Sequence, residues 1–201
     1  MLSDSEIQYL KAVEASARDR HIPVLLGDSA EYLLKYTEEL QPRRILEIGT
    51  AIGYSGMLML LTSRGATLDT IERDGERVAE AREHFAHMCV TDRVHIYEGD
   101  SRDILPTLRD NRYDLIFMDG GKSRYQEDIL MLEGMLSDNG IIFADNVLFK
   151  GLVQRAGTPN HRVRTMVNNL RKYLSIVEEQ ADYETELFEI GDGITITRKK
   201  K

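Results

Sequence analysis

Residues 187–197 read LFEIGDGITIT and contain two short runs in which apolar and polar residues alternate. The runs are joined by a turn that contains Asp192-Gly193, and Asp-Gly between two such runs is a strong signal for an antiparallel hairpin. Upstream of this stretch, strand-like and helix-like segments alternate, which predicts right-handed βαβ crossovers and a mostly parallel sheet. A plain dinucleotide-binding fold does not normally end in a hairpin, so residues 187–197 decide between variants of the doubly wound α/β fold.

Hydrophobic periodicity gives the order of the elements. Strands are expected at residues 44–48, 67–71, 94–98, 115–119 and 141–145, followed by the hairpin strands 187–190 and 194–197. An amphipathic helix is expected over residues 3–20. A second helix, capped by Asp28 or Ser29, is expected to run to Pro42. Further helices are expected to begin near residues 53, 74, 101 and 124, and a long one to span 161–178. The pattern predicts a seven-stranded, doubly wound α/β sheet that is mostly parallel.

Composition sets the frame for this fold. With 201 residues, 42% hydrophobic and 30% charged, the chain is expected to form a single domain over residues 1–201 with a substantial core. Its apolar runs are strand-sized and its N-terminus lacks an apolar signal core, so we expect a cytoplasmic protein without a membrane partner. The single Cys89 excludes an internal disulfide framework. A net charge of −8 argues against a nucleic-acid partner unless a local basic face overrides it.

Two neighbouring strands are predicted to end on carboxylates. Asp119 ends one, and Asp145 ends the next and is followed by Asn146. Because ligands of open α/β sheets bind outside the carboxyl ends of the strands, these side chains form a candidate all-oxygen site for Mg²⁺ or Mn²⁺. Lys122 follows three residues after the first carboxylate and is the candidate base. A strand-terminal Asp is often only a helix cap, but two of them beside an Asn and a Lys favour the metal site.

The residues at the ends of the first three predicted strands indicate a binding site for a nucleotide-like ligand. Residues 45–55 read as a strand, a turn bearing Gly49 and Gly53, and a helix start whose free amides can hold an anion. The three-glycine dinucleotide fingerprint is absent, and a simple tight turn is the alternative. The second strand is followed by Glu72, which can accept hydrogen bonds from a ribose. The third is followed by Asp100 and Ser101, where an adenine edge would lie. Together these ends predict a nucleoside with a small charged tail.

Five segments carry a resemblance to a known family: LEIGTAIGYS at 46–55, IE at 71–72, GDS at 99–101, FMDGGK at 117–122 and DNVLFKG at 145–151. From about residue 22 to residue 200 the chain resembles the cation-dependent, S-adenosylmethionine-dependent O-methyltransferases of the catechol and caffeoyl-CoA type. The methyltransferase variant of the doubly wound fold also ends in an antiparallel hairpin. Residues 145–153 and 191–194 are most similar to a bacterial branch that contains a tRNA 5-hydroxyuridine methyltransferase, which makes 5-methoxyuridine at the wobble base.

The resemblance implies a role for each matching residue. By it, Asp119, Asp145 and Asn146 hold Mg²⁺, and Asp119 also lies against the cofactor. The implied cofactor ligands are Glu72 at the ribose, Asp100 and Ser101 beside the adenine, Glu47, Gly49 and Ser55 at the methionine end, and Leu25 through its backbone. The family is usually dimeric. Two departures stand out: Gly120 and Gly121 replace alanines that family members often have, which suggests a more mobile loop, and the chain has no Trp to wall a catechol.

The chemistry of the residues limits the acceptor. A metal lowers the pKa of a hydroxyl, and Lys122 is placed to accept its proton if its own pKa is depressed. Two adjacent oxygens, as in catechols or in O5 and O4 of 5-hydroxyuracil, suit chelation best. Arg155, Arg162 and Arg164 belong to a basic stretch after the metal motif that is either an RNA-contacting face or an ordinary charged helix. Three hypotheses follow: methylation of tRNA hydroxyuridine, methylation of a small phenol, or a non-catalytic nucleotide-binding module.

Overall fold

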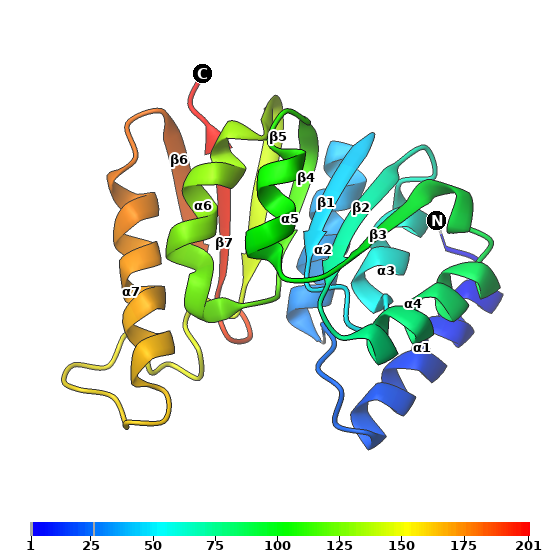
Figure 1. Ribbon diagram of the computed structural model, residues 1–201, viewed down its shortest axis with the longest axis horizontal. Coiled ribbons are helices and arrows are strands. Elements are labelled where there is room, and N and C mark those ends of the chain that lie inside the picture. Colours follow the sequence, from blue (N-terminus) through cyan, green and yellow to red (C-terminus); the bar gives the residue numbers. More distant parts are fainter. Residues whose placement is uncertain (1, 26) are drawn as a thin grey trace.

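A computed structural model describes residues 2–25 and 27–201, and its centre is a seven-stranded sheet with the strand order β3-β2-β1-β4-β5-β7-β6 (Figure 1). The strands are β1 Arg44–Ile48, β2 Thr67–Glu72, β3 Val94–Glu98, β4 Tyr113–Met118, β5 Leu136–Asp145, β6 Tyr183–Phe188 and β7 Ile194–Lys199. The α-helices are α1 Asp4–Asp19, α2 Asp28–Leu40, α3 Tyr54–Thr62, α4 Gly75–His87, α5 Ser101–Leu108, α6 Tyr125–Gly134 and α7 Arg164–Glu179. Two 3₁₀ turns, η1 Thr91–Arg93 and η2 Lys122–Arg124, complete the described elements.

The first five strands pair in parallel, and the hairpin closes the sheet. β1 lies between β2 and β4, while β3 and β5 flank this central group. β7 pairs antiparallel with both β5 and β6. The carboxyl ends of the five parallel strands therefore meet at one edge of the sheet. The predicted α/β class, the doubly wound parallel sheet and the C-terminal antiparallel hairpin are confirmed.

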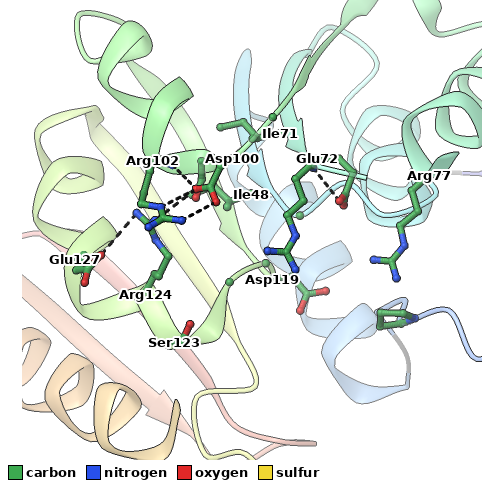
Figure 2. Close-up of a pocket in the computed structure, with 17 residues that line it drawn as sticks. Ile48, Ile71, Glu72, Arg77, Asp100, Arg102, Asp119, Ser123, Arg124 and Glu127 are labelled. Carbon is green, nitrogen blue, oxygen red and sulfur yellow. Dashed lines mark hydrogen bonds and ion pairs between the residues drawn. The ribbon is translucent and has the colours of Figure 1, made fainter. Parts of the chain in front are cut away.

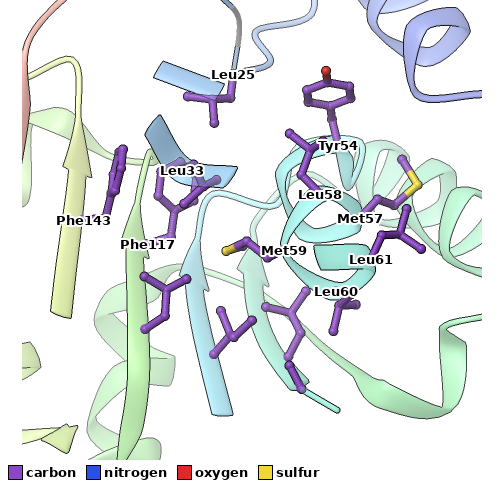
Figure 3. Close-up of a cluster of buried hydrophobic side chains, with 14 of the residues drawn as sticks. Leu25, Leu33, Tyr54, Met57, Leu58, Met59, Leu60, Leu61, Phe117 and Phe143 are labelled. Atoms are coloured by element: carbon purple, nitrogen blue, oxygen red, sulfur yellow. The ribbon is translucent and has the colours of Figure 1, made fainter. Parts of the chain in front are cut away.

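Alternation along the strands distributes the core over both faces of the sheet. In β4, Leu115 and Phe117 pack into one hydrophobic cluster, while Ile116 and Met118 pack into the other. The first cluster includes side chains from α1, α2 and α3, and most of the residues of α3 are buried in it (Figure 3). The second cluster includes side chains from α5, α6 and α7. A sheet covered on both faces requires the near-continuous apolar strands that the sequence contains.

Several predicted boundaries differ from the structure. β6 lies at Tyr183–Phe188 rather than at 187–190, so the hairpin connection is longer than expected. The cause is the turn itself, in which Gly191 and Gly193 both have positive φ and the Gly193 N–H donates to the Ile190 carbonyl. β5 begins earlier, at Leu136, and α7 begins at Arg164.

The prediction that Asp28 or Ser29 caps the second helix is wrong. The N-cap of α2 is Gly27, which makes no side-chain cap, and Asp28 and Ser29 are the first two helical residues. The Ser29 hydroxyl donates instead to Asp145 on β5. Among the described residues, no helix combines the length and the apolar character that crossing a membrane requires.

Glu133 is an ionisable group that the fold buries near the end of α6. Its side chain is 5% exposed, and its Oε1 has no hydrogen-bond partner within the described part of the chain. Burial raises the pKa of this carboxyl from 4.5 to about 7. Between these two pH values the folded chain binds more protons than the unfolded chain, so the stability contributed by protonated Glu133 is lost as the pH rises through this window.

Glu133→Gln is therefore expected to increase the free energy of unfolding at about pH 8 by about 1–3 kcal/mol, because it removes an incompletely paired buried charge. At about pH 5 the gain should be much smaller, since Glu133 is then protonated in the folded state and the pH lies only slightly above its pKa in the unfolded state. Urea unfolding of both proteins at the two pH values measures the difference. Glu38→Gln, at an exposed position of α2, is the control and should change neither value. An equal gain at both pH values would contradict the assignment of the effect to ionisation.

Candidate active site

Two adjoining cavities lie at the carboxyl edge of the parallel strands. The first has a volume of about 560 Å³ and is bordered by residues at the ends of β1, β2, β3 and β4. The second has a volume of about 380 Å³ and is bordered by residues after β4 and β5, the segment before α2 and the β6–β7 turn. Their shared wall consists of Pro23, Gly49, Glu72, Arg77, Asp119 and Gly120. Both cavities thus lie at the sheet edge that the strand ends predicted as the ligand-binding edge.

The shared wall depends on a backbone contact between two glycines. A Cβ on Gly49 would lie 2.7 Å from the Gly120 nitrogen, and Gly49 has a φ of +102°. A Cβ on Gly120 would lie 2.9 Å from the Gly49 Cα. The N–H groups of Asp119 and Gly120 both donate to the Ile48 carbonyl, which fixes the two turns against each other. Glycine at position 120 therefore has a packing reason, while the loop mobility expected from the sequence stays a prediction.

Glu72 lies between the two cavities and is anchored by the backbone. Its Oε2 accepts from the Ala51 N–H at 2.9 Å, and its Oε1 accepts from the N–H groups of Arg73 and Asp74. A carboxylate offers about four acceptor positions, so one remains for a ligand hydroxyl. The three backbone bonds fix the orientation of the carboxylate at the end of β2.

Asp100 lies in the first cavity and is surrounded by arginines (Figure 2). Its carboxylate accepts from the backbone and guanidinium of Arg102 and from Arg124 at 3.4 Å. The hydrogen bonds from Arg102 lower the pKa of Asp100 to about 2. Arg124 also contacts Asp128 at 3.1 Å, so it links the start of α5 to α6. Ser101, the first residue of α5, lines the same cavity.

Glu47 and Ser55 are adjacent to each other but line neither cavity. Glu47 is fully buried on β1, where its carboxylate accepts from the hydroxyls of Ser55 and Thr70. Burial raises the pKa of Glu47 to about 7, although the two hydroxyl donors oppose the shift. The role of these two residues at the cofactor stays a prediction. Leu25, by contrast, lines the second cavity.

The second cavity brings together the predicted metal ligands and the predicted base. Asp119, Lys122, Asp145 and Asn146 all line it. The Lys122 Nζ donates to Asp119 Oδ1 at 3.0 Å and to the Asp119 carbonyl at 3.1 Å. The Asn146 Nδ2 donates to Asp145 Oδ2 at 2.9 Å. Burial, together with the nearby Asp119 charge, raises the pKa of Asp145 to about 6.

The donor set fits a hard divalent cation. The candidate ligands are the carboxylates of Asp119 and Asp145 and the amide of Asn146. Within the described residues, no group of three His, Cys, Asp or Glu side chains converges as a metal cluster. All three residues offer oxygen, which is the ligand that Mg²⁺ and Mn²⁺ prefer. Burial raises the pKa of Asp119 as well. A buried carboxylate and a half-buried one beside a single ammonium group form a site that a divalent cation would neutralise.

The basic stretch after β5 lies outside both cavities. Arg155, Arg162 and Arg164 are all exposed, and none of them lines a cavity wall. Arg171 has a structural role, because its guanidinium donates to backbone carbonyls of the loop before α7, including those of Val153 and Gly157.

Four arginines that sequence reasoning missed do line the first cavity: Arg73, Arg77, Arg102 and Arg124. Arg77 also lines the second cavity, and its side chain is 36% exposed. The available signal was their position, since Arg73 directly follows Glu72 and Arg102 directly follows Ser101 at the edge where ligands bind. These residues give the cavity rim a positive component within an acidic chain.

The sheet order, the C-terminal hairpin and the paired cavities define an S-adenosylmethionine-dependent methyltransferase fold. The chain belongs to the O-methyltransferase family, whose model matches residues 4–200. A catechol O-methyltransferase B from Danio rerio is 31% identical over 151 residues, which cover 71% of this chain and 57% of that protein. The chain thus spans little more than half the length of this curated relative. The predicted family is confirmed, while the tRNA branch stays a prediction.

Two solved structures agree with this assignment. A Staphylococcus aureus protein, provisionally described as a caffeoyl-CoA O-methyltransferase, has a TM-score of 0.88 and 28% identity, covering 95% of this chain and 92% of its own. A methyltransferase from Podospora anserina, solved with S-adenosylhomocysteine, has a TM-score of 0.84 and 29% identity, covering 100% of this chain and 89% of its own.

The glycine contact in the shared wall leads to a test. Gly120→Ala is expected to destabilise the protein by about 1–3 kcal/mol, because the new methyl group must displace the Gly49 backbone. It should also weaken binding of S-adenosylhomocysteine, since Gly49 borders the first cavity. Thermal unfolding and calorimetry measure the two effects. Gly134→Ala is the control, because its Cβ enters open space in α6 and should be neutral or slightly stabilising. Unchanged stability and affinity in Gly120→Ala would contradict the packing role.

Proposed function

We propose that this protein transfers a methyl group from S-adenosylmethionine to a hydroxyl oxygen in a reaction that depends on Mg²⁺ or Mn²⁺. The observation that carries the proposal is the pair of adjoining cavities. One contains Glu72 and Asp100 at successive strand ends, and the other contains Asp119, Lys122, Asp145 and Asn146. The Podospora anserina relative, solved with S-adenosylhomocysteine, supports the first cavity as the cofactor site.

The residues have separate tasks in this proposal. Glu72 would accept a ribose hydroxyl, while Asp100 and Ser101 would border the adenine. Asp119, Asp145 and Asn146 would hold the cation, which when bound lowers the pKa of the acceptor hydroxyl and fixes its direction. Lys122 would accept the hydroxyl proton at Nζ in its neutral amine form, and the N–H bonds that this form still donates to Asp119 keep that nitrogen beside the cation ligands. The shared wall would hold the acceptor oxygen near the methyl donor. This proximity would supply a large part of the rate enhancement.

Asp145→Ala is expected to abolish transfer while leaving the affinity for S-adenosylhomocysteine mostly intact, because Asp145 lines the second cavity but not the first. EDTA should abolish transfer by the wild-type protein in the same way, and added Mg²⁺ or Mn²⁺ should restore it. Formation of S-adenosylhomocysteine, with both a catechol and hydroxyuridine-containing tRNA supplied, measures the activity.

Asp138→Ala provides a matched control on the same strand. Asp138 is a carboxylate of β5 whose side chain is 94% exposed, where it pairs with Lys199. Its removal should leave transfer and the response to EDTA unchanged. Full wild-type activity in EDTA would show that the oxygen cluster has no catalytic role.

For the acceptor, we propose 5-hydroxyuridine at the wobble position of tRNA. Its O5 and O4 are adjacent and suit a cation held by three oxygen ligands. Arg77, which lines both cavities, would face a phosphate that flanks a base inserted into the site. Arg155, Arg162 and Arg164 would extend this contact over the surface after β5.

A small catechol-like or caffeoyl-CoA-like phenol is the second candidate acceptor. It is favoured by the catechol O-methyltransferase from Danio rerio and by the Staphylococcus aureus structure. The same oxygen chelation serves either acceptor, so the metal site alone does not separate them. The difference lies in whether basic residues outside the catalytic cluster contribute to binding.

A double variant separates the two acceptors. Changing Arg162 and Arg164 to Gln should weaken tRNA binding and reduce the slope of affinity against salt concentration, because fewer counterions are released. Transfer to a free catechol should stay unchanged. A competition assay offering both acceptors, with binding measured at several salt concentrations, gives the result. The control is Arg109→Gln. Arg109 follows the last residue of α5, whereas the cavity residue Ser101 is the first residue of that helix. If the wild-type protein prefers the catechol, and the double variant changes neither tRNA binding nor transfer to either acceptor, the small-phenol function is favoured.

A further inference from the structure

The carboxylate of Asp145 is held from two directions. The Ser29 hydroxyl donates to Oδ1 at 3.0 Å, and the Asn146 amide donates to Oδ2 at 2.9 Å. Ser29 comes from the first turn of α2, 116 positions away in the sequence, whereas Asn146 is the next residue in the chain. The backbone carbonyl of Asp145 also accepts from the Tyr125 hydroxyl at 3.1 Å. Each oxygen of this carboxylate therefore has a fixed donor from a different element.

The contact from Ser29 is buried, in contrast to most serine contacts in a first helical turn. Ser29 is 4% exposed and Asp145 is 2% exposed. A serine at this position usually bonds to the backbone of its own turn or faces water. Here the hydroxyl extends across to β5, and the β6–β7 turn covers it, since a Cβ on Gly191 would lie 3.1 Å from the Ser29 Oγ. The second cavity is bordered by Ser29, by Asp145 and by Gly191 of the β6–β7 turn.

A single hydrogen bond leaves a carboxylate oxygen with a free lone pair. Donation by Ser29 therefore does not compete with a cation for Asp145 Oδ1, but it limits rotation of the carboxylate. Residues that bond to metal-ligating carboxylates in this way orient the ligand, and their loss typically costs 10–100-fold in metal affinity or activity.

We infer that Ser29 is a positioning residue, whose hydroxyl holds the Asp145 carboxylate in the orientation that binds the divalent cation. The inference rests on the proposed function, because it takes Asp145 to be a metal ligand. It assigns a task to a residue of α2 that belongs to none of the strand-end motifs.

The test measures Mg²⁺ binding directly by calorimetry, without acceptor or turnover. Ser29→Ala is expected to weaken Mg²⁺ binding roughly 10–100-fold, while S-adenosylhomocysteine binding measured in EDTA stays close to wild type. Ser63→Ala is the matched control. Ser63 is also buried, at 3% exposed, and its hydroxyl donates to the Pro42 carbonyl at 2.8 Å, outside both cavities. It should lose stability to a similar extent but keep wild-type Mg²⁺ affinity.

Ser29→Cys gives a second variant if the alanine protein fails to fold, because it retains the size of the side chain but replaces the hydroxyl with a weak donor. It too should bind Mg²⁺ more weakly than wild type, since a thiol donates only weakly to the Asp145 carboxylate and orients it less firmly. Wild-type Mg²⁺ affinity in either folded variant would overturn the inference and leave the proposed function intact. If the wild-type protein itself binds no Mg²⁺ and is fully active in EDTA, the metal-dependent function fails first, and the inference fails with it.

Discussion

The candidate site depends on the contact between the backbones of Gly49 and Gly120. β1 and β4 are adjacent parallel strands, with Ile48 opposite Met118 at their carboxyl ends. Both strands must then turn in the same small space, and the contact leaves no room for a Cβ on either residue. The turn after β1 borders the first cavity, while the turn after β4 carries Asp119 and Lys122. In the proposed function, the distance between the cofactor and the acceptor is therefore set by two glycines.

The charges at the site oppose folding and favour ligand binding. Asp119 and Asp145 are largely removed from water, and burial raises the pKa of both. Lys122 compensates Asp119, whereas Asp145 has only neutral donors, the hydroxyl of Ser29 and the amide of Asn146. Removing carboxylates from water is costly unless the charge is compensated. The remainder of the core must therefore stabilise this cluster, and the proposed cation would compensate its charge.

The sequence predicts the sheet and the strand-end residues because both follow from local patterns. Buried parallel strands are apolar runs, and residues at their carboxyl ends must meet at one edge, so the convergence of Asp119, Lys122, Asp145 and Asn146 could be inferred. The Ser29–Asp145 bond could not, since local pattern gives Ser29 the role of a helix cap. The ends of β6 were also missed, because its position depends on pairing with β7 and on a wide glycine turn. Arg171 illustrates a third limit, since its carbonyl partners depend on the path of a loop.

The arrangement of the arginines separates cofactor recognition from acceptor recognition. Arg102 and Arg124 are engaged by Asp100 at the first cavity, so much of their charge is already compensated. Arg77 contacts Asp74 only at 3.6 Å and lies on the wall that both cavities share. The guanidinium of Arg77 would contact an acceptor that lies between the proposed cofactor and the carboxylates of Asp119 and Asp145. A neutral catechol has no group that needs it, whereas a nucleotide brings a phosphate on each side of its base. The position of Arg77 on the shared wall therefore supports the proposed nucleotide acceptor, independently of the arginines on the outer surface.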